Sequence, residues 1–481
     1  MPIPIITVEQ MREWEQATWA AKRTPTEVIS RVGHLITART RQLTRPGDSI
    51  LILAGKGHNG DDARQVVLNL TDREVTLLNV TDPKAALREF KSLLSLPPTL
   101  IIEGLFGIGL KGPLDNDWVK LINFINRSAI PVFAVDVPAG LNADTGEPMG
   151  TSIRATHTLT LAAPKRGLVK LHAAPYIGRL ELATDIGLVP CALTSDLQWT
   201  LPKDFEQYPP VRHVDSHKGS YGHIVVCAGS LGYHGAAILA ARGALQAQPG
   251  LVTVVVPENI YPAVASQTQA AMVRPWQPAT PLPKSTTAVL FGPGMAAADL
   301  PPSLRAELSA QWKNLPLTMV ADASALDWLP PGKPRTKAIR VITPHPGEAA
   351  RLLATSVKAV QADRPAALRA LSERYGDVWV VLKGHLTLIG RSNGELFVNC
   401  SGNPWLAQGG SGDLLAGFLS ALLAQPALAS KPLLALRYAV WQHGATADTL
   451  AAEKLNWTVD TLAHQLAHRR TTGFSNPTRI I

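Results

Sequence analysis

One pattern recurs along most of the chain: a short apolar run, a turn, and then a stretch with helical periodicity. Apolar runs of this kind are typical of strands that helices cover on both faces. Their alternation with helices predicts an α/β fold with largely parallel sheets. The predicted strands are residues 49–54, 74–80, 99–102, 132–135, 158–162, 223–228, 251–256, 288–291, 318–321, 338–342 and 378–382.

The length of the chain predicts more than one domain. At 481 residues it exceeds the size at which a single hydrophobic core stops growing. Hydrophobic residues make up 46% and charged residues 17%, which is enough for large buried cores. Prolines gather at residues 195–212 and predict a linker there. We therefore expect one domain at residues 1–200 and a second at residues 210–470.

Composition also narrows the class of protein. The net charge of +9 comes without a basic block or an aromatic–basic stripe, so small anionic substrates are expected rather than nucleic acid. No uncharged apolar run reaches the roughly 18 residues that a membrane span needs. Acids stand where a signal peptide would have its apolar core. Three scattered cysteines, Cys191, Cys227 and Cys400, argue against a disulfide framework or a zinc site. These features predict a cytoplasmic protein.

A glycine-rich stretch at residues 402–417 is the strongest candidate for a functional loop. Gly409, Gly410 and Gly412 precede an apolar run at residues 414–424, which predicts a buried helix. The first amides of a helix lack partners and its dipole favours negative charge, so a phosphate or an oxyanion would fit here. Asp413 would repel an anion unless it accepts a proton beside that site. A plain glycine turn with Asp413 at the helix start is the alternative.

Several strands of the second half end in small or functional residues. Parallel strands present these ends at one edge of the sheet, so the residues should share one anion-accepting cleft. Each also has a plain structural explanation: a rigid loop for His345, a solvated strand end for Lys383 and a loop brace for Asp322. The residues are Gly229, Gly294, Asp322, His345 and Lys383.

The first half contains a G-x-G-x-x-G match at residues 55–60, between a predicted strand and a predicted helix. With Asp82 further on, this is the dinucleotide-binding fingerprint, although a generic strand-to-helix turn would look the same. A second match at residues 107–112 leads to Pro113 and is not expected to be such a turn. Glu103 and Asp136 follow two further strands, so both should lie at the carboxyl edge. Asp136 could also simply bond its own loop.

The first half resembles the NAD(P)H-hydrate epimerase family at residues 55–62, 103–110, 136–140 and 165–167. The resemblance implies a Rossmann-like three-layer domain in which Asn59 and Asp62 bind substrate and Asp136 is the acid/base group. It also implies a potassium site at the positions of Asn59, Glu103 and Ala139. The family has Asp and Ser at the last two positions, and Asp61 replaces a glycine. These departures lead us to expect an incomplete potassium site and weak or absent epimerase activity.

The second half resembles the ADP-dependent NAD(P)H-hydrate dehydratase family, which has a ribokinase-like three-layer fold. The matching motifs are residues 215–219, 229–233, 343–348, 381–384, 402–404 and 409–413, spread over about residues 210–455. Small residues are common in the family at the positions of Trp405 and His385, and neither change removes a reactive group. The resemblance implies repair of (S)-NAD(P)H hydrate with ADP as co-substrate.

The same resemblance implies roles for individual residues. Asp413 would accept the hydroxyl proton of the hydrate, and the amides of Gly410, Ser411 and Gly412 would hold the transferring phosphoryl group. Magnesium is expected to accompany the nucleotide, with no ligands assigned. The implied hydrate-binding residues are Ala236, Gly294, His345 and Asp413. The implied ADP-binding residues are Lys383, Gly384, His385, Leu386, Thr387 and Gly412.

Three other functions remain open on sequence grounds. A ribokinase-like kinase of a small alcohol or vitamin precursor would use the same Asp413 and leave a stable phosphomonoester. An oxidoreductase would rest on residues 55–60 and Asp82. A nucleotide-binding sensor would bind ligand without turnover. The fold class also leads us to expect a homo-oligomer.

Overall fold

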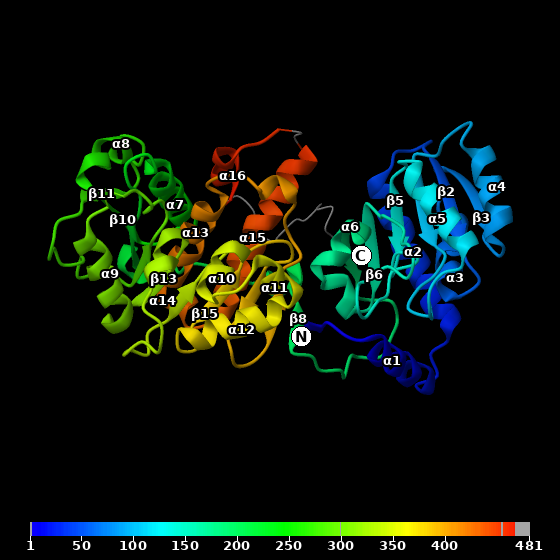
Figure 1. Ribbon diagram of the computed structural model, residues 1–481, viewed down its shortest axis with the longest axis horizontal. Helices are drawn as coiled ribbons and strands as arrows, with labels where there is room; N and C mark the ends of the chain where they lie inside the picture. The colour runs from blue at the N-terminus through cyan, green and yellow to red at the C-terminus, as the bar shows by residue number, and fades with distance from the viewer. Residues whose placement is uncertain (1, 299, 454–455, 467–481) are drawn as a thin grey trace. The chain divides into compact units, whose positions relative to one another are not determined.

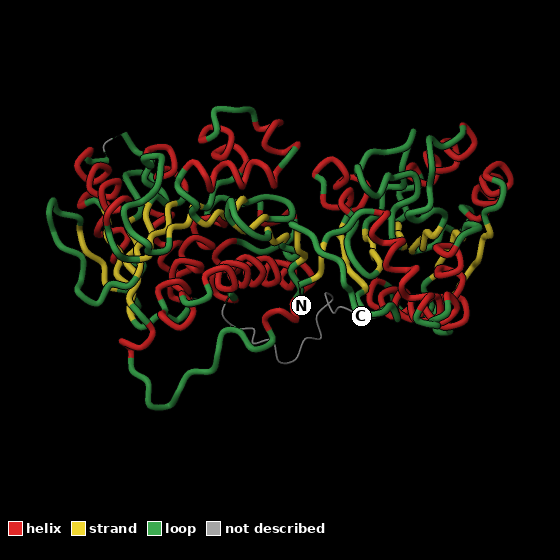
Figure 2. The backbone as a smooth tube through the Cα atoms, turned by 90° about the horizontal axis from the view of Figure 1, so that it is seen from below, coloured by secondary structure: helices red, strands yellow, loops and turns green. Residues whose placement is uncertain are grey.

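The computed structural model describes residues 2–298, 300–453 and 456–466. The chain divides between Asp196 and Leu197 into two compact units. In each unit the strands lie between helices, which gives the three-layer α/β arrangement expected (Figures 1 and 2). None of the described helices is long and apolar enough to cross a membrane.

The first unit contains a sheet in the order β3-β2-β4-β5-β6-β7, and every neighbouring pair is parallel. From β2 the chain continues to β3 on one side and then crosses to β4 on the other side, so β2 and β4 flank a topological switch point. This is the flavodoxin-like order, which differs from the classic dinucleotide-binding order. The strands of this sheet are β2 Ser49–Ala54, β3 Glu74–Asn79, β4 Leu100–Gly104, β5 Val132–Val135, β6 His157–Leu161 and β7 Arg179–Ala183. The two-residue strand β1, Ile3–Pro4, is not part of it.

Helices cover both faces of this sheet. Their ends follow the expected capping chemistry: Thr7 caps α1 in a capping box with Gln10, and Asp82 caps α4 through Lys84 N. Asp82 therefore has a structural partner, which weakens its reading as part of a dinucleotide fingerprint. The helices are α1 Val8–Ala20, α2 Pro25–Leu43, α3 His58–Asn69, α4 Pro83–Leu93, α5 Asn116–Arg127 and α6 Ala174–Ile177.

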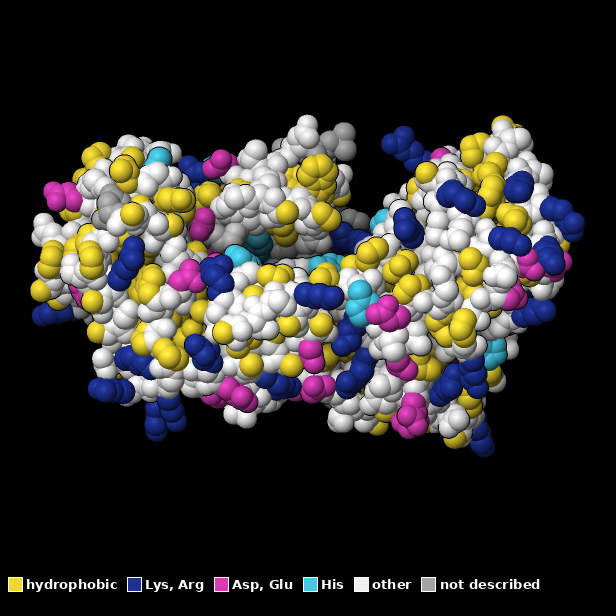
Figure 3. All heavy atoms as spheres, viewed as in Figure 1, with side chains coloured by type: hydrophobic (Ala, Val, Ile, Leu, Met, Phe, Trp, Pro, Cys, Tyr) yellow, Lys and Arg dark blue, Asp and Glu magenta, His cyan; other side chains and the backbone are white. Residues whose placement is uncertain are grey.

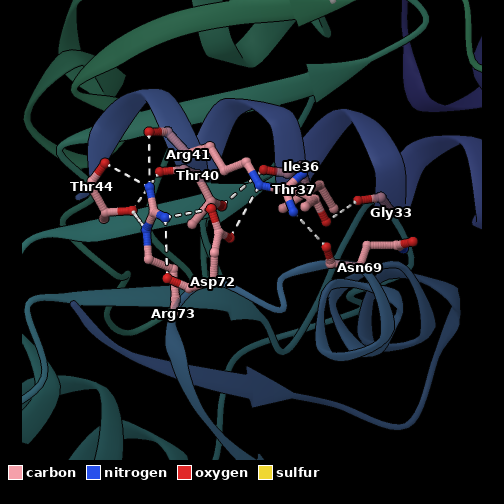
Figure 4. Close-up of polar contacts among 9 residues, drawn as sticks. All are labelled: Gly33, Ile36, Thr37, Thr40, Arg41, Thr44, Asn69, Asp72 and Arg73. Atoms are coloured by element: carbon pink, nitrogen blue, oxygen red, sulfur yellow. Dashed lines mark hydrogen bonds and ion pairs between the residues drawn. The ribbon is translucent and has the colours of Figure 1, made fainter. Parts of the chain in front are cut away.

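Polar contacts tie the C-terminal end of α2 to the turn between α3 and β3 (Figure 4). Arg73 donates to the carbonyls of Arg41 and Thr44, at 3.3 and 2.9 Å, and so satisfies acceptors that the helix end leaves open. Arg41 in turn bonds Asp72 at 3.2 Å. Gly33 of α2 packs against Gln65 of α3 so closely that a Cβ there would clash. These contacts hold α2 beside the switch point.

The second unit has a sheet that runs β8-β17-β16-β15-β14-β13-β12-β9-β10-β11. Its pairs are parallel except for β15–β16 and β16–β17, so the expectation of a largely parallel sheet is confirmed. The prediction did not include β11 or the short β16 and β17. The strands are β8 Leu197–Trp199, β9 His223–Cys227, β10 Leu251–Val256, β11 Met272–Pro275, β12 Ala288–Phe291, β13 Thr318–Ala321, β14 Arg340–Ile342, β15 Trp379–Leu382, β16 Leu388–Gly390 and β17 Leu396–Val398.

The helices of the second unit begin at α7 and end at α16. Two of them, α7 and α13, lie side by side because Gly243 faces the Leu414 carbonyl and Gly417 faces the Ala240 carbonyl with no room for a Cβ. The helices are α7 His234–Gln246, α8 Tyr261–Ala265, α9 Pro302–Asn314, α10 Pro346–Leu352, α11 Val357–Ala362, α12 Arg364–Arg374, α13 Ser411–Ala424, α14 Pro426–Ala429, α15 Pro432–Glu453 and α16 Val459–Gln465.

The linker prediction was wrong for residues 197–205. β8 pairs in parallel with β17, and Trp199 and Phe205 are buried. Phe205 packs against Tyr438 and Trp441, while Asp204 forms an ion pair with Arg437. The prolines suggested a linker, but the aromatic side chains between them belong to the core. The second unit therefore begins at Leu197 and not at residue 210.

Charged side chains are interspersed on the face of each unit that Figure 3 shows. Basic groups stand among acidic ones and among apolar side chains, without one continuous basic field on that face. In described ion pairs such as Arg64–Asp61 and Arg351–Asp327, an acidic group stands directly beside a basic one. The net charge of +9 is therefore distributed and not gathered into a single stripe on this face.

Two candidate active sites

The first candidate site lies at the start of α13, in the unit that begins at Leu197. Gly410 precedes the helix with φ of 91°, a left-handed conformation that glycine adopts without strain. The Ser411 amide donates to the Gln408 carbonyl at 3.3 Å. Of the three amides expected to hold a phosphoryl group, that of Ser411 is therefore already engaged.

Lys383 lies at this helix start. Its Nζ is 2.8 Å from Asp322 Oδ1, and that same oxygen accepts from Thr343 Oγ1 at 2.6 Å. A Cβ added to Gly412 would stand 3.4 Å from Lys383 Nζ. Asp322 is therefore more than a loop brace: it holds the lysine ammonium against the N-terminus of α13.

Asp413 is the carboxyl group of this cluster. Burial, together with the charges of Asp322 and Glu348, raises its pKa to about 7, although Lys383 opposes this. A carboxyl that titrates near neutral pH is suited to accept a proton in catalysis. The pKa of Lys383 is raised because Asp322, Glu348 and Asp413 surround the ammonium, although burial opposes this. The lysine therefore carries its charge at neutral pH.

The residues expected at the nucleotide form the hairpin between β15 and β16. Gly384 has φ of 127° and Leu386 has φ of 51°. Thr387 Oγ1 closes the turn on the Gly384 carbonyl at 2.9 Å. Burial and the charge of Arg364 both lower the pKa of His385, so that its ring is neutral. The turn can therefore present backbone groups and an uncharged ring to a ligand.

Two of the residues expected on the hydrate side, Ala236 and Gly294, lie close together after β9 and β12. A Cβ at Gly294 would stand 2.6 Å from Ala236 Cβ, so this position leaves no room for a side chain. Ser230 Oγ donates a hydrogen bond to the Gly294 carbonyl at 2.6 Å, which holds the loops after β9 and β12 together. His345 caps α10: its Nδ1 accepts from Gly347 N and Glu348 N, at 3.0 and 3.2 Å. Its Nε2 lies 3.4 Å from Glu348 Oε1.

Sequence reasoning missed two residues that support this site. Asp448, buried on α15, accepts from Gly402 N and Asn403 Nδ2, each at 3.0 Å, and so anchors the glycine-rich loop. Arg364, also buried, donates to the carbonyls of Leu382 and Lys383. The signal for Asp448 was an acid inside a long apolar helical stretch.

The second candidate site is a pocket of about 660 Å³ in the first unit. It lies at the switch point beside β2 and β4, and α1 and α2 form its apolar wall through residues such as Met11, Val28 and Val32. Asn59, Asp62 and Asp136 line it, as the resemblance implied. The loop at residues 107–111 lines it too, although no helix follows directly.

Asp136 is strongly anchored in this pocket. It has φ of 64°, and its Oδ1 accepts from Lys165 Nζ at 2.5 Å, Leu161 N at 3.1 Å and Thr160 Oγ1 at 3.2 Å. Its Oδ2 faces Gly107, where a Cβ would stand 3.7 Å away. One carboxylate oxygen is thus fully bonded, and the other faces the loop that lines the pocket.

The three positions of the family's potassium site fit an alkali cation only in part. Asn59 Nδ2 donates to the carbonyls of Phe106 and Val135, which leaves its buried Oδ1 without a partner. Glu103 accepts from Leu105 N and Ala139 N at 2.7 and 3.1 Å, and burial raises its pKa to about 7. Ala139 offers no side-chain oxygen. The described residues contain no group of three or more His, Cys, Asp or Glu that could hold a metal ion.

The expected effect of Asp61 on this pocket is weaker than the sequence suggested. Its carboxylate pairs with Arg64 at 2.8 Å, and it does not line the pocket. Arg64 also donates to the Gly55 carbonyl at 2.6 Å, so the ion pair braces the glycine loop. The extra negative charge is therefore balanced away from the place where a dinucleotide would bind.

Comparison with known proteins covers both units. The family described as NAD(P)H-hydrate dehydratase matches residues 224–470. The family described as YjeF-related protein N-terminus matches residues 68–167, a range that begins after the altered loop at residues 55–62. In the solved structures, the ADP/ATP-dependent NAD(P)H-hydrate dehydratase from Bacillus subtilis, co-crystallized with ATP and Mg²⁺, aligns with a TM-score of 0.50 and 27% identity. That match covers 56% of this chain and 95% of the other.

Curated relatives match over nearly the whole length. A bifunctional NAD(P)H-hydrate repair enzyme from Coxiella burnetii is 34% identical over 472 residues, covering 92% of this chain and 94% of the relative. The enzyme of the same description from Escherichia coli is 34% identical, covering 84% of this chain and 81% of its own. The chain therefore belongs to the family of bifunctional NAD(P)H-hydrate repair enzymes.

Proposed function

We propose that the unit beginning at Leu197 dehydrates (S)-NAD(P)H hydrate to NAD(P)H, with ADP as the phosphoryl donor. The observation that supports this is the placement of Asp413 and Lys383 together at the start of α13. A base and a fixed cation beside free helix amides are the groups that phosphoryl transfer to an alcohol requires.

The proposed reaction has two steps. Asp413 takes the hydroxyl proton of the hydrate while the hydroxyl oxygen bonds the β-phosphorus of ADP, and the bond from that phosphorus to AMP breaks. The phosphorylated hydrate then loses phosphate and a ring proton, which restores the double bond of the reduced nicotinamide. Lys383 and the Gly412 amide stabilise negative charge on the transferring group. Lys383, which we expected beside the adenine nucleotide, is assigned here to its phosphates.

Magnesium fits this proposal as an ion carried by the nucleotide. Asp322 is already committed to Lys383 and Thr343, and the described residues form no cage of metal-ligating side chains. Mg²⁺ commonly binds through substrate phosphates and waters with few protein ligands. The ion would neutralise phosphate charge, while the residues of the chain position the donor and the hydroxyl.

Hydrated NADPH and ADP test this function directly. The near-ultraviolet absorbance of NADPH should return, with one AMP and one phosphate released per NADPH. Asp413→Asn should abolish the return, and Asp327→Asn, a surface acid, should not. A stable phosphomonoester would instead indicate a small-alcohol kinase, and binding without turnover would indicate a sensor.

We also propose that the first unit interconverts the R and S hydrates with Asp136 as the acid/base group. The pocket at the switch point and the anchored Asp136 support this, and the Asp61–Arg64 pair removes one reason to expect an inactive unit. The pure R hydrate, offered without ADP, should convert to S faster than it does without protein. A rate equal to the spontaneous one would show that this unit is inactive. Repeating the assay in potassium-free buffer tests the partial cation site.

A further inference from the structure

Three carboxyl groups line the pocket of the first unit, and two of them, Asp136 and Asp62, differ in their partners. Asp136 forms a buried ion pair with Lys165, whose side chain is 0% exposed. Lys165 also donates to the Leu161 carbonyl at 2.9 Å and to Thr160 Oγ1 at 3.2 Å, so its ammonium is held in place from three sides. Among the residues that the structure describes, no lysine or arginine pairs with Asp62.

That other carboxyl, Asp62, is only 6% exposed. It stands on the first turns of α3 and lines the pocket. Within residues 2–298, 300–453 and 456–466, its side chain makes neither a hydrogen bond nor an ion pair. The neighbouring Asp61 differs, because it pairs with Arg64 and lies outside the pocket lining. A buried polar group without a protein partner is costly unless a ligand supplies the partner.

We propose, resting on the epimerase function proposed above, that Asp136 accepts a proton from the substrate and Asp62 donates one. Lys165 is the positioning residue that assigns these two roles. The ammonium of Lys165 bonds Asp136 and fixes Oδ1, which leaves Oδ2 toward the Gly107 loop. Asp62 has no cation and meets the substrate as a neutral acid.

The electrostatics of the pocket agree with this assignment. Burial is the main cause that raises the pKa of Asp62 well above its ordinary value, and the charges of Asp136, Asp61 and Glu15 add to it. Glu15, the third carboxyl of the lining, has its pKa raised by burial and by Asp136, while Lys165 lowers it. Two carboxyl groups in unlike surroundings, one paired with a cation and one buried without such a partner, are the usual basis for an acid and a base in one site.

Epimerisation needs both groups. Hydration of an enamine places the hydroxyl on the carbon next to nitrogen. Asp136 takes the hydroxyl proton as that carbon becomes a carbonyl and its bond to nitrogen breaks, and Asp62 gives its proton to the nitrogen. After the carbonyl turns its other face, nitrogen re-forms the bond, returns its proton to Asp62, and the oxygen regains the proton held by Asp136. All atoms and charges are restored, so no co-reactant is required.

The test uses the full chain, the pure R hydrate and no ADP, with chromatography to follow the two epimers. Lys165→Met and Asp62→Asn should each lower kcat by roughly a hundredfold or more, with KM changed only a few-fold. The matched control is the exposed Lys120→Met, which should keep kcat within about twofold. Dehydration of the S hydrate with ADP, measured on each variant, reports that the chain is folded.

Chemical rescue separates positioning from packing. Methylammonium should restore part of kcat to Lys165→Ala, and should not affect Lys120→Ala. Wild-type kcat in Asp62→Asn, or a change confined to KM in the Lys165 variants, would overturn the inference. A wild-type chain that leaves the R hydrate unchanged would instead overturn the epimerase function itself.

Discussion

Asp413 shows how neighbours turn an ordinary aspartate into a candidate base. Burial, Asp322 and Glu348 raise its pKa to about 7, and Lys383 opposes them. The base is the ionised form, so activity is lost as pH falls through about 7 and is gained as pH rises through it. We expect kcat/KM for dehydration to rise about tenfold per pH unit on the acid side. A flat profile between pH 5 and 8 would contradict this role.

Lys383 should affect both charge stabilisation and this profile. Because its ammonium lowers the pKa of Asp413, Lys383→Met should move the acid limb of the dehydration profile to higher pH. It should also reduce kcat by roughly a hundredfold, since a fixed cation at the transferring phosphoryl group is lost. Lys358→Met, on the exposed surface of α11, serves as the matched control for both measurements. An unshifted acid limb would mean that the two groups act independently.

At the scale of elements, the site depends on the close packing of α13 on α7. A Cβ at Gly417 would collide with the Ala240 carbonyl, which cannot move without moving α7. Gly417→Ala should therefore destabilise the second unit by about 1–3 kcal/mol, as overpacking usually does. Thermal unfolding measures this. A Cβ at Gly235 of α7 would have no atom within 4 Å, so the control substitution Gly235→Ala should be neutral or mildly stabilising.

At the scale of the whole molecule, the boundary between the units can be tested by truncation. A fragment that starts at Leu197 keeps β8, Trp199 and Phe205, whereas one that starts at residue 210 loses them all. Removal of two buried aromatic side chains should lower the free energy of unfolding by several kcal/mol and expose Tyr438 and Trp441. We expect a cooperative unfolding transition at clearly lower denaturant for the shorter fragment. Equal midpoints would restore the linker interpretation of this segment.

Sequence patterns predicted the elements well where a strand or helix has strong local signals. The strands at residues 49–54, 132–135, 251–256, 288–291 and 318–321 are confirmed with the same bounds. These are predominantly apolar runs bounded by turns, so the local pattern is sufficient. The pattern failed for β8, β16 and β17, which are three residues long and owe their pairing to distant partners. It also gave residues 197–205 to a linker, because prolines were visible and the packing of Phe205 was not.

The sequence alone determined the α/β class, the chemical identity of the candidate groups and their placement at strand ends, because parallel strands put all their carboxyl ends at one edge. Only the tertiary structure decided which of those groups act together. Lys383 meets Asp322 across 61 residues and Lys165 meets Asp136 across 29, and neither pairing has a local signal. The same holds for Asp61 and Asp62, adjacent in sequence, of which one pairs with Arg64 and the other faces the pocket. The physical reason is that charge and burial depend on neighbours in space, which only the packed fold brings together.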